Sequence, residues 1–158
     1  AYPILKRYNF KATLFIYTDF IDNSPNALSW EQLRELTKAG FEVEAHTITH
    51  ADLTLKRKGE SQPEYLKRIR RELRLPRELI RKHVGQEAVW LAYPYGRWNK
   101  LVISLAIEEG YRGGVTVTRG ATPFFVDPYR VGRNQVMNPV EGHAFEQLVK
   151  YFHGEVLQ

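Results

Sequence analysis

Two histidines four residues apart, His46 and His50, have side chains suited to metal chemistry. Neutral imidazole nitrogens bind divalent metal ions, and two histidines at this spacing can hold one ion together. In the helical version of such a pair a glutamate directly follows the first histidine. This sequence has Thr47 there, so the pair is not the motif of helical zinc proteases. The β-branched residues between the histidines disfavour a helix. The spacing alone leaves two interpretations open: two metal ligands in a loop, or a coincidence.

A second segment with chemical potential is the turn Tyr93-Pro94-Tyr95-Gly96. Pro94 has no backbone N–H and fixes the direction of the chain. Such a turn can aim the next backbone N–H, that of Tyr95, toward an oxyanion that develops during a reaction. The alternative is an ordinary turn between a strand and a helix.

Short apolar segments precede both motifs and have the length and composition of buried strands. Strands are predicted at 12–17, 41–45 and 88–92, within 111–118 and near 129–136. Helices are predicted at 30–39, 62–84, 100–109 and 141–152, and residues 1–5 resemble the tail of another. Ser29 and Ser61 each begin a capping box, which places the starts of the first two helices. Pro76 is expected to kink or divide the helix at 62–84, because proline cannot complete the helical hydrogen-bond pattern.

Strands that alternate with helices predict an α/β fold with a parallel sheet or barrel, here as a single domain over residues 1–158. In such folds the functional site gathers at the carboxyl ends of the strands. His46 and His50 follow the predicted strand 41–45, and the turn at Tyr93 follows the predicted strand 88–92. Both motifs therefore fall where this architecture would place a site.

The composition excludes several kinds of chemistry. The sequence contains no cysteine, so disulfides, thiolate metal sites and cysteine nucleophiles are ruled out. The longest apolar runs are far shorter than a membrane span, so no transmembrane segment is expected. The net charge of +5 is concentrated around the predicted helix 62–84. A basic surface can attract nucleic acid or acidic glycans, but a solvated helix face explains the pattern, and no nucleic-acid partner is expected.

The two motifs together resemble a known family. Residues 46–50 with Ala51-Asp52-Leu53 are similar to the second motif of the NodB-homology polysaccharide deacetylases, also called carbohydrate esterase family four. Leu91-Ala92-Tyr93-Pro94-Tyr95-Gly96 resembles their third motif. The flanking segments agree, so the resemblance covers about residues 1–136. It is closest in character to the branch that deacetylates poly-N-acetylglucosamine-like polymers.

The resemblance implies a distorted (β/α) barrel that removes acetyl groups from an N-acetylglucosamine-containing polysaccharide. In this family a divalent metal ion, commonly zinc, is held by one aspartate and two histidines and activates a water. A second aspartate is the general base, and another histidine protonates the leaving amine. The resemblance implies His46 and His50 as metal ligands, the Tyr95 backbone N–H as oxyanion donor, and Tyr93 and Pro94 as parts of a sugar groove. Looser candidates for lining that groove are Trp98, Phe124 and Asp52.

The sequence also departs from the family pattern. The first motif, an aspartate pair at a strand end, is expected shortly before Ala1, so the domain is interpreted as truncated at its N-terminus, with the general base and acid upstream. Asp19 and Asp22 do not match that motif in context. The third motif usually carries an arginine where this sequence has Ala92, as in the poly-N-acetylglucosamine branch. His143 lies near the expected late motif, but its context does not match.

Two further expectations follow from the resemblance. Loss of a barrel strand would expose a sheet edge, so a dimer or complementation by another strand is expected there. The family acts mostly outside the cytoplasm, so a periplasmic, cell-surface or secreted location is expected. The alternative function is a catalytically inactive deacetylase-like domain that binds glycan or a partner, which the absence of the aspartate pair from the full-length protein would favour.

Overall fold

The computed structural model describes residues 1–119, 127–137 and 140–150. Four parallel strands form one sheet in the order β1-β2-β3-β4. The strands are β1 (Thr13–Ile16), β2 (Glu42–Ala45), β3 (Trp90–Ala92) and β4 (Gly113–Val115). The α-helices are α1 (Tyr2–Arg7), α2 (Trp30–Lys38), α3 (Gln62–Val84), α4 (Lys100–Glu108) and α5 (Gly142–Lys150). This order confirms the predicted α/β fold with a parallel sheet; among the described residues the strands form an open sheet, with β1 at one edge.

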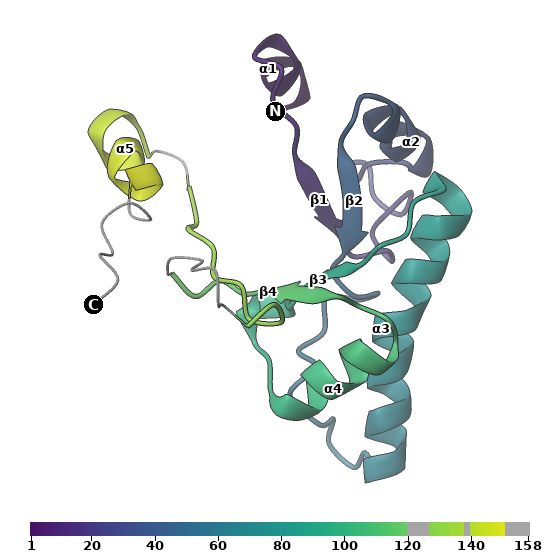
Figure 1. The fold of residues 1–158 in the computed structure, drawn as a ribbon. Coiled ribbons are helices and arrows are strands. Elements are labelled where there is room, and N and C mark those ends of the chain that lie inside the picture. Colours follow the sequence, from purple (N-terminus) through teal and green to yellow (C-terminus); the bar gives the residue numbers. More distant parts are fainter. Residues whose placement is uncertain (120–126, 138–139, 151–158) are drawn as a thin grey trace.

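Helices α2, α3 and α4 cover one face of the sheet (Figure 1). They begin at the residues that their sequences predict. Ser29 accepts the backbone N–H of Gln32 at 3.1 Å and donates its own to the Gln32 side chain at 2.8 Å, so the capping box is complete. The same reciprocal box opens α3 at Ser61, and the side chain of Asn99 caps α4. No helix among the described residues combines the length and apolar character needed to cross a membrane.

The core lies between these helices and the sheet. Its fully buried side chains include Leu33 of α2, Ile69 and Leu73 of α3, and Val43 and Leu91 of the strands. These residues recur at helical spacing on α3 and in the strand interiors, which is why the hydrophobic pattern predicted the elements. Burial of this surface attaches the helices to the sheet and fixes the strand ends that carry both motifs.

Two sequence expectations are revised. Pro76 does not divide α3, which continues through it as one element, and the proline is buried. The segment near 129–136 was expected to form a strand, but it forms an isolated parallel bridge, between Val131 and Val115 of β4. Backbone hydrogen bonds also join Val131 to Gly114 and Thr116, at 2.9 and 2.8 Å, but Gly132 and Asn134 have low strand propensity, and the segment does not continue as a regular strand. The described part of the terminal helix, α5, lies apart from the sheet (Figure 1).

Candidate metal site

The carboxyl ends of β1, β2 and β3 lie at one edge of the sheet, and this edge carries both motifs. His46 directly follows β2, and its backbone N–H donates to the carbonyl oxygen of Ile16 at the end of β1, at 2.8 Å. Tyr93 directly follows β3. Because neighbouring parallel strands end side by side, segments that are far apart in the sequence meet at this edge.

His46 is held in one orientation by the neighbouring strand. Its Nδ1 lies 2.7 Å from the carbonyl oxygen of Ala92, the last residue of β3. A carbonyl oxygen can only accept, so Nδ1 carries a hydrogen and donates it. Burial lowers the pKa of His46, and the hydrogen bond to Ala92 offsets only part of this effect. The ring is therefore neutral near neutral pH, and the lone pair of Nε2 is available to a metal ion.

His50 lies against His46, with ring centroids 4.6 Å apart and ring planes at 78°. Its backbone N–H donates to Oγ1 of Thr47 at 3.1 Å. Its ring also contacts the rings of Tyr17 and Tyr95, at centroid distances of 5.5 and 4.8 Å. The loop thus brings two imidazoles together beside the rings of Tyr17 and Tyr95, where they can share one ion.

Three residues around the imidazoles have a left-handed backbone: Thr47 (φ 70°), His50 (φ 59°) and Tyr95 (φ 59°). For residues with a Cβ atom this conformation costs on the order of 1–2 kcal/mol each. Such strain persists only where the surrounding structure fixes the backbone. At Thr47 the side chain is fully buried, and the carbonyl oxygen accepts the N–H of Thr18 at 3.2 Å. The buried Thr47 side chain and the hydrogen bond from Thr18 therefore fix the backbone of the histidine loop at this residue.

The turn after β3 is a short 3₁₀ segment, η1 (Pro94–Gly96). Tyr93 is only 1% exposed, and its hydroxyl donates to the carbonyl oxygen of Tyr129 at 3.0 Å. Pro94 is buried as well. Tyr95 is 59% exposed, and its ring lies beside His50. Of the three predicted residues in this turn, Tyr95 presents its side chain at the surface, whereas Tyr93 and Pro94 support the turn from beneath.

Arg97 and Asp52 extend the rim of the site beyond Tyr95. The Arg97 guanidinium lies 5.8 Å from the centroid of the Tyr95 ring, and its Nη1 donates to Oδ2 of Asp52 at 2.7 Å. Oδ1 of Asp52 accepts from both the N–H and the hydroxyl of Thr54. Burial acts to raise the pKa of Asp52, but the hydrogen bonds from Thr54 and Arg97 together lower it below its usual value. Asp52 and Tyr95 were predicted from the sequence, whereas Arg97, which contacts both, was not.

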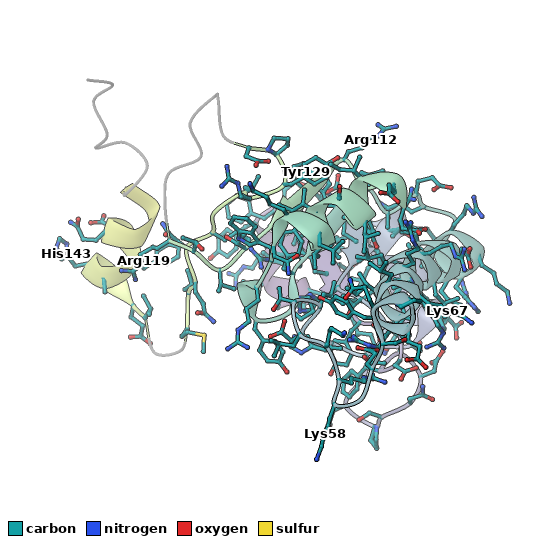
Figure 2. All side chains as sticks on the ribbon, turned by 90° about the horizontal axis from the view of Figure 1, so that it is seen from below. Lys58, Lys67, Arg112, Arg119, Tyr129 and His143 are labelled. Carbon is teal, nitrogen blue, oxygen red and sulfur yellow. The ribbon has the colours of Figure 1, made fainter. Side chains whose placement is uncertain are left out.

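The remaining candidates are not brought to the imidazoles. Trp98 packs against the core with an arginine guanidinium 5.1 Å from its ring centroid. Phe124 lies outside the described residues. His143 is on α5, where its side chain is 81% exposed and stands away from the body of the molecule (Figure 2).

Two histidines do not complete a catalytic metal site, since such sites use further protein ligands and a water. Across residues 1–119, 127–137 and 140–150, no group of three or more histidine, cysteine, aspartate or glutamate side chains is placed to hold an ion. Asp19 is joined to the histidine loop through its backbone, whose N–H donates to the carbonyl oxygen of Ile48 at 3.0 Å. The imidazole nitrogens of His46 and His50 fit a divalent ion such as zinc and would supply two of its ligands.

Glu72 of α3 lies beneath the loop between the histidines, and the sequence analysis did not identify it as a site residue. A signal was present in the sequence. Glu72 interrupts the apolar stripe of the helix next to Ile69 and Leu73, where a charged residue is unusual unless it has buried partners.

The family model described as polysaccharide deacetylase matches residues 1–114. The chain belongs to the polysaccharide deacetylase family. It is 31% identical over 163 residues to the poly-beta-1,6-N-acetyl-D-glucosamine N-deacetylase of Staphylococcus epidermidis, covering 98% of this chain and 54% of the relative. The enzyme of the same name from Staphylococcus aureus strain MRSA252 is 28% identical over 159 residues, with 98% and 53% coverage. The chain therefore spans about half the length of these curated relatives.

Solved structures of deacetylases share this fold. The Streptococcus pyogenes deacetylase PplD, in complex with acetate, superposes with a TM-score of 0.79 at 26% identity, over 96% of this chain and 62% of that one. A Bacillus anthracis pseudoenzyme of carbohydrate esterase family four gives a TM-score of 0.58 at 23% identity, over 72% of this chain and 36% of that one. The predicted NodB-type deacetylase fold is confirmed by these similarities, and both motifs lie within the matched part of the domain.

Proposed function

We propose that the protein hydrolyses acetamide groups of an N-acetylglucosamine-containing polysaccharide, using a divalent metal ion, zinc, held in part by His46 and His50. The observation that carries this proposal is the meeting of the two imidazoles at 4.6 Å, with Nδ1 of His46 bonded to Ala92 and Nε2 left free. The polymer class is supported by relatives named as poly-beta-1,6-N-acetyl-D-glucosamine N-deacetylases.

In this proposal His46 and His50 would hold a divalent metal ion, which would supply Lewis-acid polarisation of the acetamide carbonyl and of a water. The residues of this chain do the positioning. His46 and His50 would contribute imidazole nitrogens to the ion, and the Tyr95 backbone N–H donates to the oxyanion that develops on the substrate. The exposed Tyr95 ring, braced by the Arg97 guanidinium, offers a flat surface on which a sugar ring can stack. Asp52 holds Arg97 in that place through the 2.7 Å ion pair.

The test uses the natural full-length protein and β-1,6-linked N-acetylglucosamine oligomers, with released amines as the readout. Zinc content and activity are compared among the wild type, His46→Ala, His50→Ala and the control His143→Ala, which alters an exposed histidine on α5. We expect zinc binding and amine release in the wild type and the control, and loss of both in the two loop variants. Equal zinc content in His46→Ala would remove this residue from the site.

A second candidate function is an inactive deacetylase-like domain that binds glycan. It is favoured by one observation: the described residues supply two potential ligands at the site, and none completes a group of three. The same experiment separates the two functions, because this candidate predicts oligomer binding without amine release from the full-length protein at any zinc concentration.

We also propose that the protein acts outside the cytoplasm, where such polymers accumulate, and that the free edge of β1 pairs with a further strand. Beside that edge lies a pocket of about 320 Å³ lined by residues of β1 and the following loop, among them Phe15, Tyr17 and Phe20. Sedimentation of the 158-residue chain against the full-length protein tests the second point, since an uncovered edge predicts self-association of the shorter chain alone.

A further inference from the structure

The carboxylate of Glu72 binds the two residues that separate the site histidines. Its Oε2 accepts the backbone N–H of Ile48 at 2.9 Å and that of Thr49 at 3.1 Å. Its Oε1 accepts the hydroxyl of Thr49 at 2.8 Å. Glu72 reaches this position from the middle of α3, where it is 2% exposed among core side chains. One carboxylate therefore makes three hydrogen bonds to Ile48 and Thr49.

This arrangement is unusual for a buried charge. Within the described part of the chain, no arginine, lysine or histidine lies at ion-pair distance from Glu72. An unpaired carboxylate loses its hydration on burial, so only the donors of the loop satisfy it. Arg68 of the same helix acts on Glu72 only electrostatically, and the hydrogen bonds of this carboxylate in the described part of the chain all go to Ile48 and Thr49.

The two histidines are anchored in different ways. His46 is attached to the sheet through its N–H to Ile16 and its ring to Ala92, at 2.8 and 2.7 Å. His50 follows the Glu72-bound dipeptide directly, and both it and Thr47 have left-handed backbones that would relax if they were released. The position of His50 relative to His46 therefore depends on the hydrogen bonds of Glu72 to Ile48 and Thr49.

We propose that Glu72 is a positioning residue that sets the spacing of the two histidines and thereby the metal affinity of the site. This inference rests on the proposed function, because it concerns the same ion. Glu72 contacts the loop between the histidines and not their imidazole rings. It acts as the carboxylates and carbonyls behind metal-binding histidines do, but on the loop backbone instead of on an imidazole ring.

The experiment compares Glu72→Leu, Glu72→Asp and Glu72→Gln in the natural full-length protein. Zinc affinity is measured by competition with a chelator, and the visible spectrum of the cobalt(II)-substituted protein reports ligand geometry. We expect about 10- to 100-fold weaker zinc binding in Glu72→Leu, the loss typical of removing a supporting residue, together with an altered cobalt spectrum. Glu72→Asp, whose carboxylate is too short to reach the loop, should weaken binding as well and serves if the leucine variant does not fold.

Glu72→Gln is the rescue variant, because its amide oxygen can accept both N–H groups while its NH₂ donates to the Thr49 hydroxyl. It should keep zinc affinity within a few-fold of the wild type and retain the cobalt spectrum. The matched control is Arg77→Met, which removes a charged anchor of the same helix from the opposite end of the sheet. It should lower thermal stability but leave zinc affinity and the spectrum unchanged.

Two results would overturn the inference: wild-type affinity and spectrum in Glu72→Asp or Glu72→Leu, or an equal loss of affinity in Arg77→Met, which would reduce the effect to general destabilisation. If the wild-type protein binds zinc and releases amines while the Glu72 variants bind zinc equally well, this inference fails and the proposed function stands. Absence of zinc binding by the wild type would defeat both.

Discussion

At the carboxyl end of the sheet, Glu72 of α3 accepts backbone N–H groups from the histidine loop, whereas at the amino end Arg77 of the same helix donates to backbone carbonyls. The Nε of Arg77 donates to the carbonyl oxygen of Ala88 at 2.7 Å, and Nη1 donates to that of Glu109. One helix thus contacts both ends of the sheet through side chains of opposite charge. The negative one accepts backbone N–H groups at the carboxyl end, and the positive one donates to backbone carbonyl oxygens at the amino end.

The two ends differ in which residues take the left-handed conformation. At the amino end they are three glycines, Gly40, Gly85 and Gly110, for which positive φ carries little strain, and Asn9, a residue type that tolerates this conformation. At the carboxyl end they include Thr47, His50 and Tyr95, for which it does. The difference indicates that the amino end is built for stability, whereas the carboxyl end keeps strained residues because their side chains are needed at those positions.

The largest expected effect on stability comes from Arg77→Met. It removes two charge-assisted hydrogen bonds and the packing of the guanidinium over the Tyr111 ring, whose centroid lies 5.3 Å away. The free energy of unfolding, measured by urea titration, should fall by about 3 kcal/mol. A change below about 1 kcal/mol would mean that the amino end does not depend on this anchor.

Zinc should stabilise the full-length protein by binding to the histidines at the carboxyl end of the sheet, independently of the amino end. At a free zinc concentration of about 100 times Kd, the free energy of unfolding should rise by about 2.7 kcal/mol. Arg77→Met should show the same rise from a lower starting value, and His46→Ala should show none. A rise of equal size in His46→Ala, measured in parallel urea titrations, would contradict the assignment of the site.

Alanine and glycine pairs measure the backbone strain directly, because each pair differs only by a Cβ atom. At position 95 glycine should be more stable than alanine by about 1 kcal/mol, and Gly85→Ala should lose a similar amount. A Cβ atom added at Gly85 would meet no neighbouring atom, so the stability change in Gly85→Ala reports the backbone conformation alone. At the exposed helix position Lys67 the order should reverse, with alanine the more stable. If alanine were more stable than glycine at position 95, as expected at position 67, backbone strain at Tyr95 would be excluded.

The smallest effect on stability is expected from Glu60, which lies between the histidine loop and α3. The side chain of Arg68 donates to Glu60 at 2.6 Å, and this bond lowers the pKa of Glu60 from 4.5 to about 2. Because the folded-state pKa is below the unfolded one, the stabilisation is present above pH 4.5 and is lost between pH 4.5 and about 2. The stability difference between the wild type and Glu60→Gln should therefore shrink over that range in urea titrations, and a constant difference would exclude this linkage.

Local signals in the sequence account for most of the fold and for part of the site. The capping boxes at Ser29 and Ser61 and the apolar strand segments predicted where the elements lie, because both depend on neighbouring residues. Pro76 was expected to kink or divide the helix, yet α3 continues through it with the proline among its buried residues. Glu72 and the pairing of Arg97 with Asp52 were missed because their partners lie 23 or more residues away along the chain. Contacts of that kind follow from the assembled fold, which local patterns do not contain.

The strand order β1-β2-β3-β4 is the order of synthesis, and this has a consequence for how the protein folds. Each strand pairs with the one made just before it, so the sheet can grow at its newest edge while the chain emerges from the ribosome. The histidine loop is made before α3, and Glu72 follows Thr49 by 23 residues. The two imidazoles therefore reach their final spacing only after α3 has emerged and docked on the sheet.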